Sequence, residues 1–161
     1  MSSLDSHQPL LPSLLDRLLD DDPGQTTEPL WRGSFRVEDL RRQLQRDLED
    51  LLNTRHARMD LLETPCELGV STLTYGLLDQ TGLIGSGGEV IERMRTAVER
   101  TVRAYEPRLR DVAVTISGRE EFDRNIHLTI RAVLCVDPIV EPVTFDTTLE
   151  TSTGGCDVKL A

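Results

Sequence analysis

An amphipathic stretch from Glu89 to Tyr105, followed by a proline at position 107, divides the chain into a helical part and a strand-rich part. Side chains suited to a buried face recur along it at helical spacing: Val90, Ile91, Met94, Ala97, Val98, Thr101, Val102 and Tyr105. Pro107 has no N–H to donate and disfavours the α conformation in Glu106, so the helix is expected to end near Tyr105. The sequence therefore predicts a rigid corner that presents Glu106 and Arg108 outward, just before a strand.

An earlier helix is predicted to begin at Val37, because the acids that follow it favour a helix N-terminus. Its apolar stripe consists of Val37, Leu40, Leu44, Leu48, Leu51 and Leu52. Asn53 is expected to end this helix as a left-handed C-cap. A separate leucine stripe between Pro9 and Leu19 predicts a short N-terminal helix that stops at the break in residues 20–24.

Between Ala57 and Gly88 the hydrophobic pattern is weak. Residues 67–75 are expected to form one or two helical turns, and residues 75–79 a turn that leads into a loop. The region before Glu89 is therefore predicted to contain helix and linker and no strand.

Four segments with alternating apolar residues follow the corner: Val112 to Ile116, Ile126 to Leu134, Val143 to Leu149, and Cys156 to Leu160. Their connections are short enough for an antiparallel meander, and one face of each is apolar. The sequence thus predicts an α+β fold, an antiparallel four-stranded meander sheet with two main helices packed on one face and a short N-terminal helix. Residues 1–33 are expected to form an amphipathic segment and linker, and residues 34–161 the folded domain.

The net charge of −10 argues against general nucleic-acid binding. No apolar run approaches the ~18–20 residues that a membrane-spanning helix needs, and the N-terminal residues do not resemble a secretory signal. Cys66, Cys135 and Cys156 form no metal-binding or disulfide pattern, which favours a reducing, cytoplasmic setting. The three histidines are far apart in sequence, so no metal site, cofactor or catalytic group is predicted.

Three short segments occur in a characteristic order: Leu51-Leu52-Asn53-Thr54-Arg55, then Tyr75-Gly76-Leu77 with Asp79, then Glu106-Pro107-Arg108-Leu109 before a Val-x-Val strand. Together they resemble the TssE family, a baseplate component of the bacterial type VI secretion system. That family is similar to the small wedge protein of contractile phage tails once called a baseplate lysozyme. The family usually shows Asn-Tyr-Gly-Leu-Pro-Asp, whereas this chain has Thr74 before the tyrosine and Leu78 in place of the proline.

The resemblance implies a structural role and no enzymatic activity, in a cytoplasmic baseplate docked at the inner membrane. It implies that Glu106, Pro107 and Arg108 bind the helical core bundle of the wedge proteins TssF and TssG, in a baseplate that also contains TssK. An alternative is that Glu106 and Arg108 pair within the domain and only brace the corner.

The resemblance also implies that the sheath proteins TssB and TssC begin to polymerise at an edge of the sheet. The last predicted strand, with Cys156, Val158 and Leu160, is the candidate edge. Two other functions are weighed, a peptidoglycan-cleaving muramidase and a regulatory anti-adaptor that shares the domain type. A muramidase needs two carboxylates across a sugar cleft, and only Glu106 has a special setting in this sequence.

Overall fold

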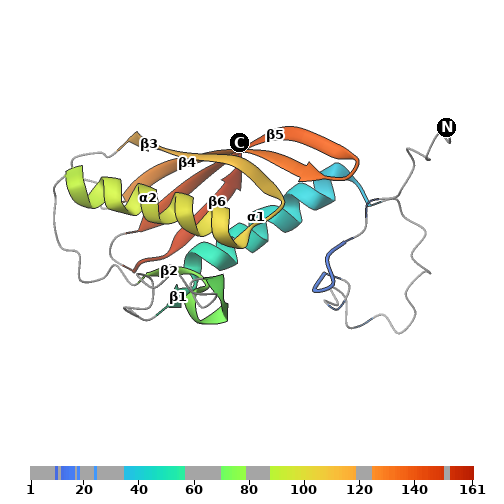
Figure 1. Ribbon diagram of the computed structural model, residues 1–161, viewed down its shortest axis with the longest axis horizontal. Coiled ribbons are helices and arrows are strands. Elements are labelled where there is room, and N and C mark those ends of the chain that lie inside the picture. The colour runs from blue at the N-terminus through green and yellow to red at the C-terminus, as the bar shows by residue number, and fades with distance from the viewer. Residues whose placement is uncertain are drawn as a thin grey trace. The chain divides into compact units, whose positions relative to one another are not determined.

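The computed structural model describes residues 35–56, 70–78, 88–118, 125–150 and 153–161, together with residues 10, 12–16, 18 and 24. Two helices precede a four-stranded sheet, as Figure 1 shows. The chain divides into two compact units, residues 1–44 and 45–161, and the first helix runs from one into the other.

The first helix, α1 (Val37–Asn53), begins and ends where the sequence predicts. The carboxylate of Asp39 accepts a 3.0 Å hydrogen bond from the N–H of Arg36, the return half of a capping box. The leucines of its stripe are buried: Leu40, Leu44, Leu48, Leu51 and Leu52. The left-handed C-cap at Asn53 is wrong, because Asp111 is the only non-glycine residue of the described part with a positive φ.

The second helix, α2 (Gly88–Tyr105), buries Met94, Val98 and Val102 along one face. Its last backbone bond runs from the N–H of Glu106 to the carbonyl of Val102, at 2.9 Å. The helix therefore stops just before Pro107, as the sequence predicts.

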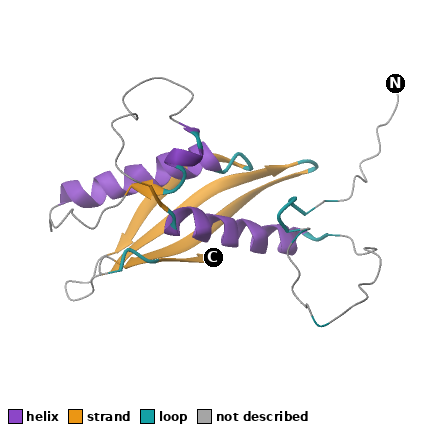
Figure 2. Cartoon of the chain, turned by 90° about the horizontal axis from the view of Figure 1, so that it is seen from below, coloured by secondary structure: helices purple, strands orange, loops and turns teal. Residues whose placement is uncertain are grey.

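The sheet consists of β3 (Leu109–Gly118), β4 (Asn125–Val136), β5 (Ile139–Glu150) and β6 (Cys156–Leu160). The strands lie in the order β3-β4-β5-β6 and are antiparallel throughout, which confirms the predicted α+β fold and meander. Alternate residues of the two central strands are buried: Ile126, Leu128, Ile130, Ala132 and Leu134, and Val143, Phe145, Thr147 and Leu149. α2 and the part of α1 from residue 45 onward lie on the same face of the sheet (Figure 2).

Two short strands precede α2, contrary to the sequence prediction. β1 (Arg55–His56) pairs in parallel with β2 (Leu77–Leu78), so residues 77–78 are not part of a turn into a loop. Of the one or two helical turns expected at residues 67–75, the described part includes the 3₁₀ turn η3 (Thr72–Thr74). Strands of two residues are too short to produce an alternating pattern, which is why the sequence did not reveal them.

The predicted N-terminal helix lies partly outside the described residues. Residues 14–16 and 18 form turns, and the N–H of Leu18 bonds to the carbonyl of Leu15 at 2.9 Å. This three-residue spacing is that of a turn and not of an α-helix, so the described positions do not form the expected helix. The division at residues 33 and 34 stays a prediction.

Candidate interaction sites at a proline corner and two sheet edges

Residues 106–108, the proline corner, form a tight turn between α2 and β3. Two backbone hydrogen bonds fix the turn. The N–H of Leu109 donates to the carbonyl of Glu106 at 3.1 Å, and the N–H of Glu106 donates to the last turn of α2. Pro107 is exposed, whereas Glu106 is only 5% exposed. The corner thus presents its proline to solvent and turns its glutamate inward.

The two charged side chains of the corner bind each other. The Nε of Arg108 donates to Oε1 of Glu106 at 2.6 Å, and Nη2 donates to Oε2 at 2.5 Å. The same Nη2 donates to Oδ2 of Asp47 on α1 at 2.6 Å. The guanidinium therefore ties the corner to α1 through a bidentate pair and one further ion pair.

This arrangement corrects the expectation that both charged side chains face outward. The side chain of Glu106 is 7% exposed and that of Arg108 is 23% exposed. Burial acts to lower the pKa of Arg108, but the hydrogen bonds and charges of Glu106 and Asp47 outweigh it and raise that pKa. Arg108 is thus a permanently charged group with part of its surface in water.

The described parts of the three segments that resemble TssE meet around this corner, and Asp79 lies outside the described residues. The N–H of Leu77 donates to the carbonyl of Thr54 at 2.9 Å, which joins the first segment to the second. The rings of Tyr75 and Tyr105 make an edge-to-face contact with centroids 5.3 Å apart, which joins the second segment to the end of α2. Burial raises the pKa of Tyr75, and the nearby carboxylates of Asp50, Asp47 and Glu106 raise it further.

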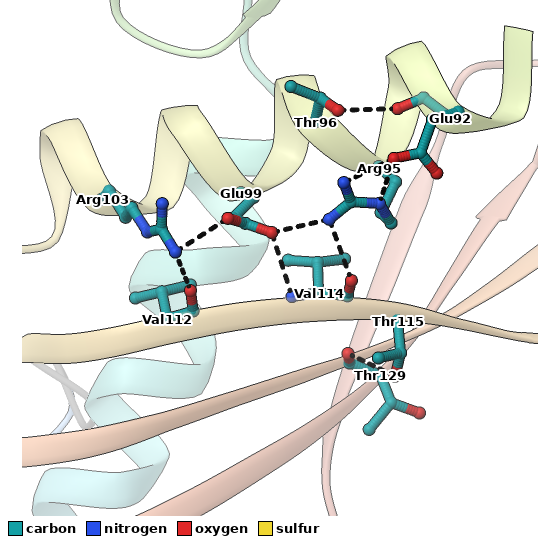
Figure 3. A network of polar contacts seen from close by, with 9 residues as sticks. All are labelled: Glu92, Arg95, Thr96, Glu99, Arg103, Val112, Val114, Thr115 and Thr129. Atoms are coloured by element: carbon teal, nitrogen blue, oxygen red, sulfur yellow. Dashed lines mark hydrogen bonds and ion pairs between the residues drawn. The ribbon is translucent and has the colours of Figure 1, made fainter. Parts of the chain in front are cut away.

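The outer edge of β3 is closed by charged side chains of α2, as Figure 3 shows. Arg103 donates to the carbonyl of Val112 at 2.5 Å, and Arg95 donates to the carbonyl of Val114 at 3.3 Å. Glu99 accepts from the N–H of Val114 at 3.4 Å and pairs with both arginines, at 2.7 and 2.8 Å. We call Arg95, Glu99 and Arg103 the charged clamp; it occupies backbone groups that an added strand would need.

The outer edge of β6 is bonded by neutral amides of α1. The carboxamide of Asn53 donates to the carbonyl of Cys156 and accepts from its N–H, both at 2.8 Å. Gln45 donates to the carbonyl of Val158 at 2.8 Å. The sequence predicted that β6 is an edge strand, and the strand order confirms this. The sequence did not reveal the amide bonds to α1.

The side chains of the predicted edge strand differ in burial. Cys156 and Val158 are 6% and 1% exposed, whereas Leu160 is 40% exposed. Burial, opposed by the charge of Arg55 and aided by Glu49 and Asp157, raises the pKa of the Cys156 thiol to about 12. The sulfur is therefore part of the core and not a reactive group.

Arg55 provides a further tie between α1 and the start of β6. Its guanidinium donates to the carbonyl of Leu52 at 2.5 Å and also to the carbonyl of Gly154. Gly154 has a φ of +73°, a conformation that suits glycine in the turn between β5 and β6.

No group of three or more metal-ligating side chains gathers within the described residues. Glu106, on which the muramidase alternative depends, is buried against Arg108 and so does not face a cleft. Neither α1 nor α2, the helices of the described part, has the length and apolarity of a bilayer-spanning segment.

A family model described as "Baseplate wedge protein gp25" matches residues 38–138. The matched region runs from the first turn of α1 to the turn between β4 and β5, so it includes the proline corner and excludes β6. No curated protein and no solved structure matches the chain. Because the match covers more than half of this chain's residues, the chain belongs to the family of the baseplate wedge protein gp25.

Proposed function

We propose that this chain is the TssE subunit of a bacterial type VI secretion baseplate, a cytoplasmic structural protein in an assembly docked at the inner membrane. Membership of the gp25 family supports a structural role in a baseplate, together with other baseplate proteins. One observation carries the finer assignment. The three segments that resemble TssE, far apart in sequence, meet in one cluster around the proline corner.

In this proposal the corner binds the core bundle of TssF and TssG, and its three residues have different roles. Pro107 is exposed and forms the contact, and the exposed part of Arg108 donates to a partner carboxylate. Glu106 is buried and holds Arg108 in place. Because the guanidinium is already fixed by Glu106 and Asp47, it loses little conformational entropy when a partner binds.

Replacing Arg108 by alanine is a poor test of this interface, because the change also leaves Glu106 buried without its partner. Pro107→Asp is sharper, since the side chain is exposed and position 107 donates no backbone bond. Pro142→Asp on β5 is the matched control, because that proline is also exposed.

The test is co-purification with TssF, TssG and TssK from cells. We expect Pro107→Asp to reduce capture of the wedge at least about tenfold, with a wild-type melting temperature, and Pro142→Asp to capture it normally. Wild-type capture by a folded Pro107→Asp protein would rule out the corner as the docking site.

The second part of the proposal is that strands of TssB and TssC join the outer edge of β6. In β6 the N–H and C=O groups of Cys156, Val158 and Leu160 point outward, because Ala161 and Gly155 bond inward to β5. Strand addition along such an edge gives affinity through main-chain hydrogen bonds.

Leu160→Pro tests this edge, because it removes one outward N–H and leaves the inward ladder of β6 intact. Leu160→Ala is the control, because it shortens the same exposed side chain and keeps the N–H. We expect sheath assembly in cells to fail with the proline and to proceed with the alanine, while both variants capture TssF and TssG. Normal sheath assembly with Leu160→Pro would show that the sheath starts elsewhere.

A further inference from the structure

The carboxamide of Asn53 occupies the outer edge of β6 in the way that a neighbouring strand would. It gives one donor and one acceptor to the two backbone groups of Cys156, and both bonds are 2.8 Å long. Residues of antiparallel strands exchange the same pair of bonds. Gln45, two helical turns earlier on α1, adds a donor to the carbonyl of Val158.

We propose that Asn53 and Gln45 form an amide latch on β6, and that an extended strand joins this edge by displacing them. The inference rests on the proposed addition of a strand at β6 and adds its regulation. Three of the outward backbone groups, the N–H and C=O of Cys156 and the C=O of Val158, are already bonded to the latch. A strand that pairs along the whole of β6 needs all three.

The exchange of the latch's hydrogen bonds for those of an incoming strand is close to balanced in free energy, so the latch can open. Each bond that the latch gives up is replaced by a bond from the main chain of the incoming strand. The released amides are neutral, Asn53 is exposed and Gln45 is half-buried, so both side chains can be hydrated when they move away. The backbone of β6 remains bonded before and after the exchange.

The charged clamp on β3 differs in this respect. Glu99 has a side chain only 19% exposed, and it is bonded to Arg95, Arg103 and the N–H of Val114. A strand added at β3 would separate this carboxylate from its partners, which costs more than the release of a neutral amide. The two edges are therefore closed to different degrees, and β6 is the edge that opens.

Gln45→Met tests the latch, since methionine keeps the length of the side chain and removes the donor. Synthetic peptides that cover the arms of TssB and TssC serve as probes, and their affinity is measured by fluorescence anisotropy. Arg93→Met is the control, because it places the same side chain on the exposed surface of α2. We expect Gln45→Met to bind the arm peptide about 3- to 10-fold more tightly than wild type, because the peptide no longer has to displace the hydrogen bond of Gln45.

A measurement on the wild-type protein covers the case in which the variant folds poorly. The side-chain NH₂ signals of Asn53 and Gln45 in ¹⁵N NMR report on the latch directly. On adding the peptide, we expect these protons to exchange faster with water, while the backbone N–H of Cys156 stays protected.

The outcomes separate the latch from the proposed function. A peptide that binds wild type and Gln45→Met equally, with unchanged NH₂ signals, would refute the latch and leave strand addition standing. A peptide that binds neither protein would refute strand addition at β6, and the latch with it. Tighter binding to Gln45→Met, with wild-type affinity for Arg93→Met, would support both.

Discussion

Arg108 and Asp47 are 61 residues apart in the sequence and are joined by an ion pair of 2.6 Å. Asp47 lies in the middle of α1, whereas Arg108 lies between α2 and β3. Since the same guanidinium also binds Glu106, one arginine connects α1 to the point where the chain passes from helix to sheet. The proline corner is therefore part of the framework of the domain as well as a candidate docking site.

Arg108→Ala should destabilise the protein strongly, because it removes the partner of a buried carboxylate. Breaking a buried ion pair on one side costs about 3 kcal/mol or more. We expect urea unfolding to show a loss of about 3 kcal/mol in the free energy of unfolding. A variant as stable as wild type would mean that Glu106 finds water or another donor.

The double variant Glu106→Gln/Arg108→Met should be more stable than Arg108→Ala, because it leaves no buried, unpaired charge in place of the pair. We expect it to recover at least about half of the lost free energy of unfolding. The comparison uses the same urea titration. An equal loss in both variants would show that packing of the arginine side chain matters more than its charge.

Glu99→Ala should open the outer edge of β3. The N–H of Val114 loses its acceptor and the two arginines lose their shared carboxylate, so we expect the free energy of unfolding to fall by about 1–3 kcal/mol. The amide of Val114 should exchange faster with solvent, and the variant should self-associate in sedimentation experiments because a sheet edge is exposed.

Glu89→Ala is the matched control, because it removes an exposed i,i+4 ion pair with Arg93 on the same helix. It should leave stability and association state unchanged. If Glu99→Ala keeps the wild-type association state and a protected Val114 amide, the charged clamp does not guard the edge.

The sequence predicted the elements that repeat a pattern over many residues. α1 and the four strands of the main sheet have apolar positions at regular spacing, and these positions are the buried ones, for example Leu48 in α1 and Ile130 in β4. The stop at Pro107 could be predicted because proline acts on the backbone beside it, whatever the tertiary structure.

Most contacts of the candidate sites could not be predicted, since they join residues that are distant in sequence. The pairing of Glu106 with Arg108, two residues apart, was left open as an alternative. Asn53 was expected to cap α1 locally, but its amide binds Cys156 on β6, 103 residues later. Glu106 was expected to face a partner, but it pairs inward with Arg108, which also binds Asp47 on α1. A polar residue in a sequence shows its capacity for hydrogen bonds and not where the partner lies.

Stability should fall as the pH rises above about 9, because of Cys156. Burial raises the folded-state pKa of its thiol to about 12 from an ordinary value of 9.0, so the unfolded chain loses the proton first. Between pH 9 and 10 the unfolded state therefore holds fewer protons, and the free energy of unfolding decreases with pH by about 1 kcal/mol from this group. Below about pH 8 this contribution is nearly constant.

The measurement is urea unfolding of wild type and Cys156→Ala at pH 8, 9 and 10. The variant should be less stable than wild type at pH 8, because it leaves a small cavity in the core. Its stability should then decline less steeply with pH. Parallel pH profiles for the two proteins would contradict the assignment.

Gly76 should not tolerate any side chain, because it brings the second short segment against the first. Its φ is +103°, and a Cβ at this position would lie 2.3 Å from the carbonyl oxygen of Thr54. That oxygen accepts the bond from Leu77 that begins β2, so it cannot move away without loss of the small sheet. Gly76→Ala should therefore cost at least about 2 kcal/mol in the free energy of unfolding.

Gly88→Ala is the matched control, because a Cβ there meets nothing within 4 Å and alanine favours the helix, so stability should stay equal or rise. If both alanine variants unfold at the wild-type urea midpoint, the contact between residues 54 and 76 does not define the cluster around the corner.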